Sequence, residues 1–96
     1  MDRQTALTLL ATHKPQLARQ FGVSSLALFG STARGQAHDG SDVDILISFT
    51  TAATSKQYFS ARFYLEDVLQ CPVDLVTDKA LREELRPYVA RDAIHV

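Results

Sequence analysis

Two aspartates open an apolar segment of this sequence and could bind a metal ion. Asp42 and Asp44 stand two positions apart in "SDVDILISF", so on an extended strand both side chains leave one face, while Val43 and Ile45 leave the other. Neighbouring carboxylates repel each other and raise at least one pKa unless a cation neutralises them. Oxygen ligands favour Mg²⁺ or Mn²⁺, and the cysteine and histidines lack the spacing typical of zinc. We therefore predict a divalent metal site here.

A third carboxylate, Asp74, lies inside the apolar segment "PVDLV", residues 72–76. Alternation places Asp74 on the opposite face from Val73 and Leu75. If this segment is a strand beside residues 43–49, three carboxylates converge on one pair of metal ions. The alternative is a charge that deters aggregation at an edge strand. The presence of two other aspartates in the same kind of position favours the metal site.

Gly30 and Ser31 follow a further apolar segment, "SLALF", residues 25–29. Glycine lets the backbone approach a ligand closely, and the hydroxyl and N–H of serine suit phosphate oxygens. A Gly-Ser pair alone means little. Gly-Ser after an apolar strand, then ten residues, then Asp-x-Asp at the start of another apolar strand, is a specific pattern that indicates phosphate binding beside a metal.

The elements that must position these residues indicate a small α+β fold. Helices are expected at residues 3–12, 15–21, 54–70 and 78–91, and strands at 25–29, 43–49 and 72–76. Pro15 is expected to start the second helix, Gly22 to end it, Asp78 to cap the fourth, and Pro87 to break it. The segment 30–41 is expected to be a loop between antiparallel strands. We predict a small mixed or antiparallel sheet with helices packed on the face away from that loop.

The helix expected at residues 54–70 has two apolar faces. One stripe consists of Tyr58, Ala61, Leu65, Val68 and Leu69. Phe59 and Phe63 point well away from it. Either the helix is wedged deeply between layers or its second face contacts a partner protein, and the small size of the domain slightly favours the partner.

Composition limits the function classes further. A chain of 96 residues is expected to form one domain, residues 1–96, with no second lobe. The net charge is -1 and basic residues are scattered, which argues against DNA or RNA as a partner. No signal peptide or membrane span is expected. With Cys71 as the single cysteine, a packed free thiol in a reducing, cytoplasmic setting is expected.

The segment "GSTARGQAHDGSDVD" resembles the signature of nucleotidyltransferases of the DNA polymerase beta superfamily. Within that superfamily, "LFGS.ARG", "SDVDILI" and "PVDLV" resemble the minimal nucleotidyltransferase (MNT) domains, and the likeness extends from residue 21 to the final "AIHV". The resemblance implies that Gly30 and Ser31 hold the β- and γ-phosphates of a nucleoside triphosphate. It implies that Asp42 and Asp44 bind both metal ions, and that Asp74 completes one metal site and helps deprotonate the attacking hydroxyl.

Two further residues of the signature belong to the expected nucleotide-binding set. Arg34 is expected either to contact phosphate or to brace the loop through Asp42 or Asp39. Ser41 is included in this set, although a hydrogen bond between loop and strand is expected of it more than direct contact with the nucleotide.

The resemblance also implies a partner. MNT domains are commonly paired, as antitoxins, with HEPN-domain ribonuclease toxins, and members of the family adenylylate a tyrosine of the toxin. We therefore expect an antitoxin that transfers AMP from ATP to a hydroxyl of a HEPN partner, using Mg²⁺ or Mn²⁺, with Phe59 and Phe63 as candidate contacts. A hetero-oligomer is expected, and a homodimer stays open.

Two alternatives are a non-catalytic antitoxin that occludes its toxin and a small-molecule, antibiotic-type nucleotidyltransferase. The intact Ser31 and three aspartates argue against the first, and the missing acceptor domain argues against the second.

Overall fold

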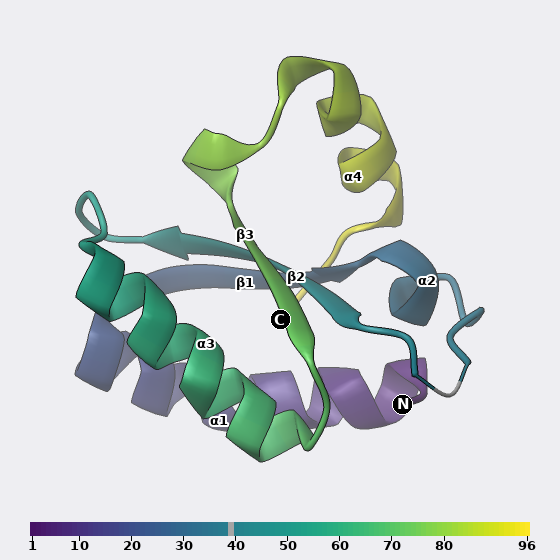
Figure 1. Ribbon diagram of the computed structural model, residues 1–96, viewed down its shortest axis with the longest axis horizontal. Helices are drawn as coiled ribbons and strands as arrows, with labels where there is room; N and C mark the ends of the chain where they lie inside the picture. The colour runs from purple at the N-terminus through teal and green to yellow at the C-terminus, as the bar shows by residue number, and fades with distance from the viewer. Residues whose placement is uncertain (39) are drawn as a thin grey trace.

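A mixed β-sheet forms the centre of the molecule in the computed structural model, which describes residues 1–38 and 40–96 (Figure 1). The strand order is β3-β2-β1-β4. Strand β1 (Val23–Phe29) pairs antiparallel with β2 (Val43–Phe49) and with β4 (Ile94–His95), whereas β2 is parallel to β3 (Val73–Thr77). The predicted α+β class with a small mixed sheet is confirmed, including the antiparallel pairing of the strands that flank the Gly-Ser segment.

Two long helices cover one face of this sheet. The helical elements are α1 (Arg3–Phe21), α2 (Gly30–Ala33), α3 (Ser55–Leu69), the 3₁₀ turns η1 (Asp78–Ala80) and η2 (Glu83–Leu85), and α4 (Arg86–Asp92). In Figure 1, α1 and α3 lie together on one side of the sheet, and α4 lies on the other side, near α2. No helix within the described ranges is both long enough and apolar enough to cross a lipid bilayer.

The hydrophobic core lies between the sheet and the two long helices. Strand β2 shows the alternation clearly, because Val43, Ile45 and Ile47 are almost completely buried while the residues between them are not. The core cluster is completed by Ala6, Leu10, Leu17, Val23, Leu26, Leu28, Ala33, Ala61, Leu65, Leu69, Val73 and Leu75. Strand β2 therefore has one face in the core and one face that is partly exposed, whereas Leu26, Ala27 and Leu28 of β1 are all buried.

Helix α1 is continuous, so the prediction of two helices separated at Pro15 is wrong. Proline lacks the N–H that would bond to the carbonyl of Ala11. Both residues are exposed, so water can solvate the freed carbonyl, while Leu10 and Leu17 on either side anchor the helix in the core. Gly22 ends the helix as expected, in a left-handed conformation with φ of 72°.

The structure differs from the sequence-based prediction in four further places. The segment expected to be a loop begins with the short helix α2. The helix predicted over residues 78–91 is instead two 3₁₀ turns, η1 and η2, followed by the short helix α4. Pro87 lies in the first turn of α4, where a missing N–H costs no bond within the helix, and does not break one. Thr77 and not Asp78 caps the following 3₁₀ turn, through its side chain and the N–H of Ala80. The short strand β4 has no signal in the sequence and was missed.

Helix α3 has the expected boundaries and two distinct faces. Thr54 and Gln57 form a capping box at its start, and Gln70 ends it in a left-handed conformation with φ of 56°. Its buried face packs on the sheet, whereas Phe59 is 46% exposed and Phe63 is 63% exposed. The deep-helix interpretation is therefore wrong for this chain, because the second apolar face is open to solvent.

Candidate active site

Asp44 and Asp74 lie side by side on the face of the sheet opposite the core. They are direct partners in the parallel register of β2 and β3, where Val43 and Ile45 face the buried side. Burial raises the pKa of Asp44 to about 6, and the negative charges of Asp74 and Asp42 add to this effect. The structure thus brings together two of the three predicted carboxylates at a position where charge is costly.

Gly30 forms the contact between the Gly-Ser turn and this carboxylate pair. It starts α2 with φ of 73°, directly after the residue of β1 that pairs with Asp44. A Cβ atom built on Gly30 would lie 2.1 Å from Oδ2 of Asp44 and 2.8 Å from its Cγ. Any side chain here would displace the carboxylate, so glycine is required both by the backbone conformation and by the close approach.

Ser31 follows in the first turn of α2 and is partly buried. Its carbonyl accepts the N–H of Gln36 at 2.8 Å, which closes the turn. Among residues 1–38 and 40–96, no hydrogen bond to its hydroxyl is found, so this group can bind a ligand.

Asp42 is more peripheral than predicted. It is exposed, one residue before β2, although its charge contributes to the raised pKa of Asp44. Within the described part of the chain, no three side chains of His, Cys, Asp or Glu are assembled as a metal site. The expected convergence of three carboxylates is therefore not preformed.

The donor set nevertheless suits a divalent cation. Asp44 and Asp74 offer only oxygen atoms, which Mg²⁺ and Mn²⁺ prefer. The raised pKa of Asp44 reflects a site that favours neutralisation of its carboxylate, by a proton or by a cation. These two residues fit such an ion, and Asp42 is close enough in sequence to supply further oxygens.

Arg34 braces α2, and its ion-pair partner among the described residues is Asp92. Its Nη1 donates to Oδ2 of Asp92 at 2.7 Å, and its Nε donates to Gln36 at 3.1 Å. Asp42 is thus not its ion-pair partner, and Asp39, the other expected partner, lies outside the described residues. Asp92 comes from α4, far along the sequence, and no local signal identified it.

Ser41 has the ordinary role weighed for it in the sequence. Its Oγ accepts the N–H of His38 at 3.2 Å, and its own N–H donates to the carbonyl of the same residue at 3.0 Å. These bonds shape the end of the segment that leads into β2.

Glu66 was also missed by sequence reasoning and holds the start of β3 in place. Its Oε2 accepts the N–H of Val73 at 3.0 Å, one residue before Asp74. The N–H of Val43 donates to the carbonyl of Pro72 at 3.0 Å. Asp74 is therefore positioned from α3 on one side and from β2 on the other. The available signal was a glutamate in the last turns of the expected helix, seven residues before Val73.

Cys71 precedes this strand as a partly buried free thiol. Burial raises its pKa, which makes it a poor nucleophile, as expected from the sequence.

The comparison with known proteins identifies relatives along almost the whole chain. A model of the nucleotidyltransferase domain matches residues 10–95. The protein adenylyltransferase MntA of Thermococcus cleftensis is 36% identical over 89 residues, which are 93% of this chain and 90% of that protein. A solved structure described as a minimal nucleotidyltransferase is similar with a TM-score of 0.77 and 34% identity, over 98% of this chain and 95% of that one.

Two solved toxin–antitoxin structures share the fold at lower identity. One, determined with AMP-PNP, has a TM-score of 0.72 and 23% identity over 88% of this chain and 69% of that one. The other contains a tri-AMPylated HEPN toxin of Shewanella oneidensis in complex with an MNT antitoxin. It has a TM-score of 0.65 and 20% identity over 92% of this chain and 69% of that one. At these identities the likeness shows the fold.

Proposed function

The chain belongs to the nucleotidyltransferase domain family, and we propose that it is an antitoxin that transfers AMP from ATP to a hydroxyl of a HEPN-domain toxin. One observation supports this most directly. The glycine that starts the Gly-Ser turn lies directly against the carboxylate of Asp44, which pairs with Asp74 in the sheet. A triphosphate held at that turn would meet the carboxylates that hold its metal ions.

The donor half of the reaction uses the Gly-Ser turn. The N–H groups of Gly30 and Ser31 and the hydroxyl of Ser31 would hold the terminal phosphates of ATP. Asp42, Asp44 and Asp74 would hold Mg²⁺ or Mn²⁺. When bound, the ions neutralise the phosphate charge that otherwise repels the nucleophile.

The acceptor half requires a hydroxyl from outside the chain, and a tyrosine of the toxin is the proposed source. Its oxygen bonds to the α-phosphorus while the bond to the β-phosphate oxygen breaks and pyrophosphate leaves. Asp74, which is exposed at the edge of the sheet, accepts the proton of that hydroxyl. The position of Asp74 on the edge strand leaves it open to an incoming protein.

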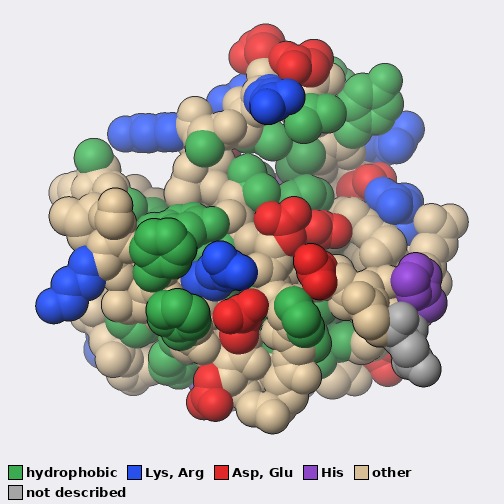
Figure 2. Space-filling model, in the orientation of Figure 1, with side chains coloured by type: hydrophobic (Ala, Val, Ile, Leu, Met, Phe, Trp, Pro, Cys, Tyr) green, Lys and Arg blue, Asp and Glu red, His purple; other side chains and the backbone are tan. Residues whose placement is uncertain are grey.

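The exposed aromatic face of α3 supports a docking surface for this partner. Phe59 and Phe63 stack with ring centroids 6.5 Å apart, and a groove of about 440 Å³ adjoins Phe59, between α3 and the segment from Leu75 to Ala80. Figure 2 shows hydrophobic side chains over α3 on the same face of the molecule as a cluster of acidic side chains. A toxin bound there would have the carboxylates within reach of its own residues.

Transfer of label tests the reaction. With the HEPN partner co-purified, Mg²⁺ and ATP labelled in the α-phosphate, we expect label on the toxin. Asp44→Asn should abolish it, and Asp67→Asn, which changes an exposed aspartate of α3, should not. A toxin that stays unlabelled with the wild-type protein would contradict the proposed reaction.

Occlusion without catalysis gives a different result in cells. If the variant with Asp42→Ala and Asp44→Ala protects against the toxin as well as the wild type does, binding alone explains the antitoxin effect.

A matched pair of variants tests the docking surface. Phe59→Glu should weaken toxin binding, whereas Tyr88→Glu, which changes an aromatic residue that is 59% exposed on α4, should not. Equal binding by the wild type and Phe59→Glu would show that the toxin docks elsewhere.

A further inference from the structure

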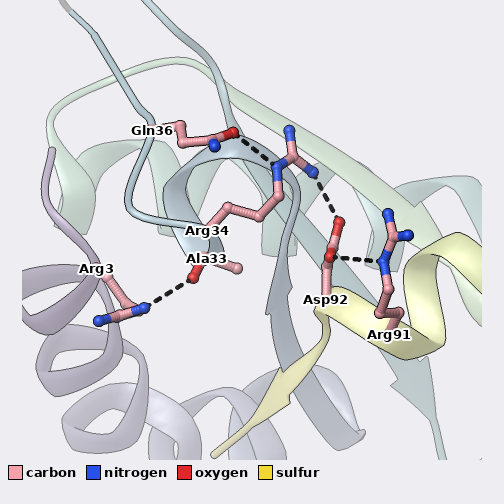
Figure 3. Close-up of polar contacts among 6 residues, drawn as sticks. All are labelled: Arg3, Ala33, Arg34, Gln36, Arg91 and Asp92. Carbon is pink, nitrogen blue, oxygen red and sulfur yellow. Dashed lines mark hydrogen bonds and ion pairs between the residues drawn. The ribbon is translucent and has the colours of Figure 1, made fainter.

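An ion pair links the phosphate-binding turn to the C-terminal end of the chain. Arg34 follows the last residue of α2, and Figure 3 shows its guanidinium between Gln36 and Asp92. The distance from Nη1 to Oδ2 of Asp92 is 2.7 Å, and Nε of Arg91 lies 3.5 Å from Oδ1 of the same carboxylate. The Asp92 side chain is only 12% exposed, compared with 42% for Arg34. Asp92 is therefore enclosed by two cations, and the one from α2 is its shortest contact.

The backbone around Asp92 is fixed relative to the start of α2. Strand β4 begins two residues after Asp92 and pairs Ile94 with Leu28 of β1. Leu28 in turn lies two residues before Gly30. The pair between Arg34 and Asp92 thus closes a small ring: β1, α2, the ion pair, the end of α4 and β4. Such a ring restrains the turn from its C-terminal side.

A second contact restrains the same turn from α1. Nη1 of Arg3 donates to the carbonyl of Ala33 at 3.3 Å (Figure 3). This bond satisfies a carbonyl at the end of α2 but leaves the Arg34 guanidinium untouched. The contact with Asp92 is the one that fixes both the turn and the position of the Arg34 guanidinium beside it.

The Arg34 guanidinium keeps binding capacity after these contacts. Guanidinium has five N–H groups, and the bonds to Gln36 and Asp92 use two of them within residues 1–38 and 40–96. Its backbone N–H donates to the carbonyl of Gly30 at 3.1 Å, so the guanidinium extends from the same turn that lies against Asp44. The Arg34 guanidinium, held in this position, attracts an anionic ligand that binds at the Gly30–Ser31 turn.

We propose that Asp92 is a positioning residue for the donor nucleotide. By its ion pair with Arg34, it holds α2 and the positively charged Arg34 guanidinium in the arrangement that binds the triphosphate. The inference rests on the proposed function. Asp92 touches neither the nucleotide nor the reacting atoms, and its effect is on nucleotide affinity more than on the chemical step. Loss of the Arg34–Asp92 ion pair lets the guanidinium rotate and the turn relax, which lowers the affinity for the nucleotide.

Direct titration with a fluorescent, non-hydrolysable ATP analogue and Mg²⁺ tests this, without an acceptor protein. We expect Asp92→Asn to raise the dissociation constant about fivefold, the size of a favourable partly buried ion pair, and Asp92→Glu to restore much of the affinity. In the labelling reaction the KM for ATP should rise by a similar factor while kcat changes less than twofold.

A matched control separates positioning from general loss of an ion pair. Asp78 pairs with Arg86 at 3.4 Å in the same C-terminal region, away from α2. Asp78→Asn should leave nucleotide affinity unchanged, and the melting temperatures of the two variants should agree within a few degrees.

A double-mutant cycle identifies the route. In an Arg34→Gln background, which breaks the same pair from the other side, Asp92→Asn should have no further effect on affinity. An unchanged dissociation constant for Asp92→Asn would overturn the inference, as would an equal effect in both backgrounds. A wild-type protein that binds no nucleotide would instead contradict the proposed function itself.

Discussion

The two faces of the sheet meet opposite demands, although β2 contributes to both. Toward α1 and α3, Val43 and Ile45 are fully packed in an apolar core. Toward the other side, Asp44 lies against Asp74 and the start of α2, and its pKa is raised to about 6. Burial of apolar side chains on the covered face stabilises the fold. Repulsion between neighbouring carboxylates on the open face destabilises it unless a cation neutralises them.

This contrast indicates where the chain tolerates change. Residues of the covered face are expected to affect folding, and residues of the open face are expected to affect the reaction. Helix α3 repeats the contrast, since Leu65 is buried while Phe63 is exposed. If the two faces are independent, substitutions on one should leave the property governed by the other intact.

Asp74→Asn should reduce AMP transfer about a thousandfold, because it removes a charge that holds the metal and accepts a proton. The free energy of unfolding should change by no more than about 0.5 kcal/mol. Initial rates of label transfer and urea denaturation measure the two quantities, with Asp67→Asn as the control. A large loss of stability in Asp74→Asn would mean that the open face also supports the fold.

Ile45→Ala, on the covered side of the same strand, should lower the free energy of unfolding by about 3 kcal/mol through the cavity it leaves. Ile45→Val should cost about 1 kcal/mol. Urea denaturation measures both, and the fraction that remains folded should bind the ATP analogue with wild-type affinity. Loss of affinity in folded Ile45→Val would show that the two faces are not independent.

Gly30→Ala should destabilise the protein by about 2 kcal/mol, compared with about 1 kcal/mol for Gly35→Ala. Both glycines have φ of 73°, but a Cβ on Gly35 meets nothing within 4 Å, so the difference isolates the contact with Asp44. Thermal unfolding gives the two values. Adding Asp44→Ala to Gly30→Ala should restore the extra stability that Gly30→Ala loses relative to Gly35→Ala. Equal losses of stability in the two single variants would contradict the close contact with Asp44.

The pH dependence of stability should show the cost of the open face in metal-free protein. Because the pKa of Asp44 is about 6 in the folded state and near 4 in the unfolded chain, the folded state binds more protons between these values. Stability contributed by this group is therefore complete below pH 4 and is lost as pH rises through 6, by about 1 kcal/mol after solvent screening.

Asp44→Asn is the control for this titration, since it removes the group without changing its shape. Urea denaturation of both proteins from pH 4 to pH 8 should show a difference in stability that changes in favour of the variant as pH rises. A constant difference would mean that Asp44 has an ordinary pKa.

Local patterns in the sequence were sufficient for much of the fold and for the residues of the site. Alternation in residues 43–49 predicted β2 correctly, and helical periodicity predicted both faces of α3. Where the prediction failed, packing outweighed a local preference. Pro15 stays within one helix because leucines on either side of it are anchored in the core. Strand β4 is only two residues long and exists because β1 offers it a free edge.

Local sequence specifies which groups this protein brings to the reaction: a Gly-Ser turn and three aspartates on or beside strands. Spacing of two along a strand is local geometry, so it needs no knowledge of the rest of the chain. How these groups meet is a property of the folded chain alone. The parallel register places Asp74 opposite Asp44 and leaves Asp42 outside, and Asp92 arrives beside Arg34 from 58 residues away. Such contacts depend on how distant segments pack against a shared core, and no local pattern encodes that packing.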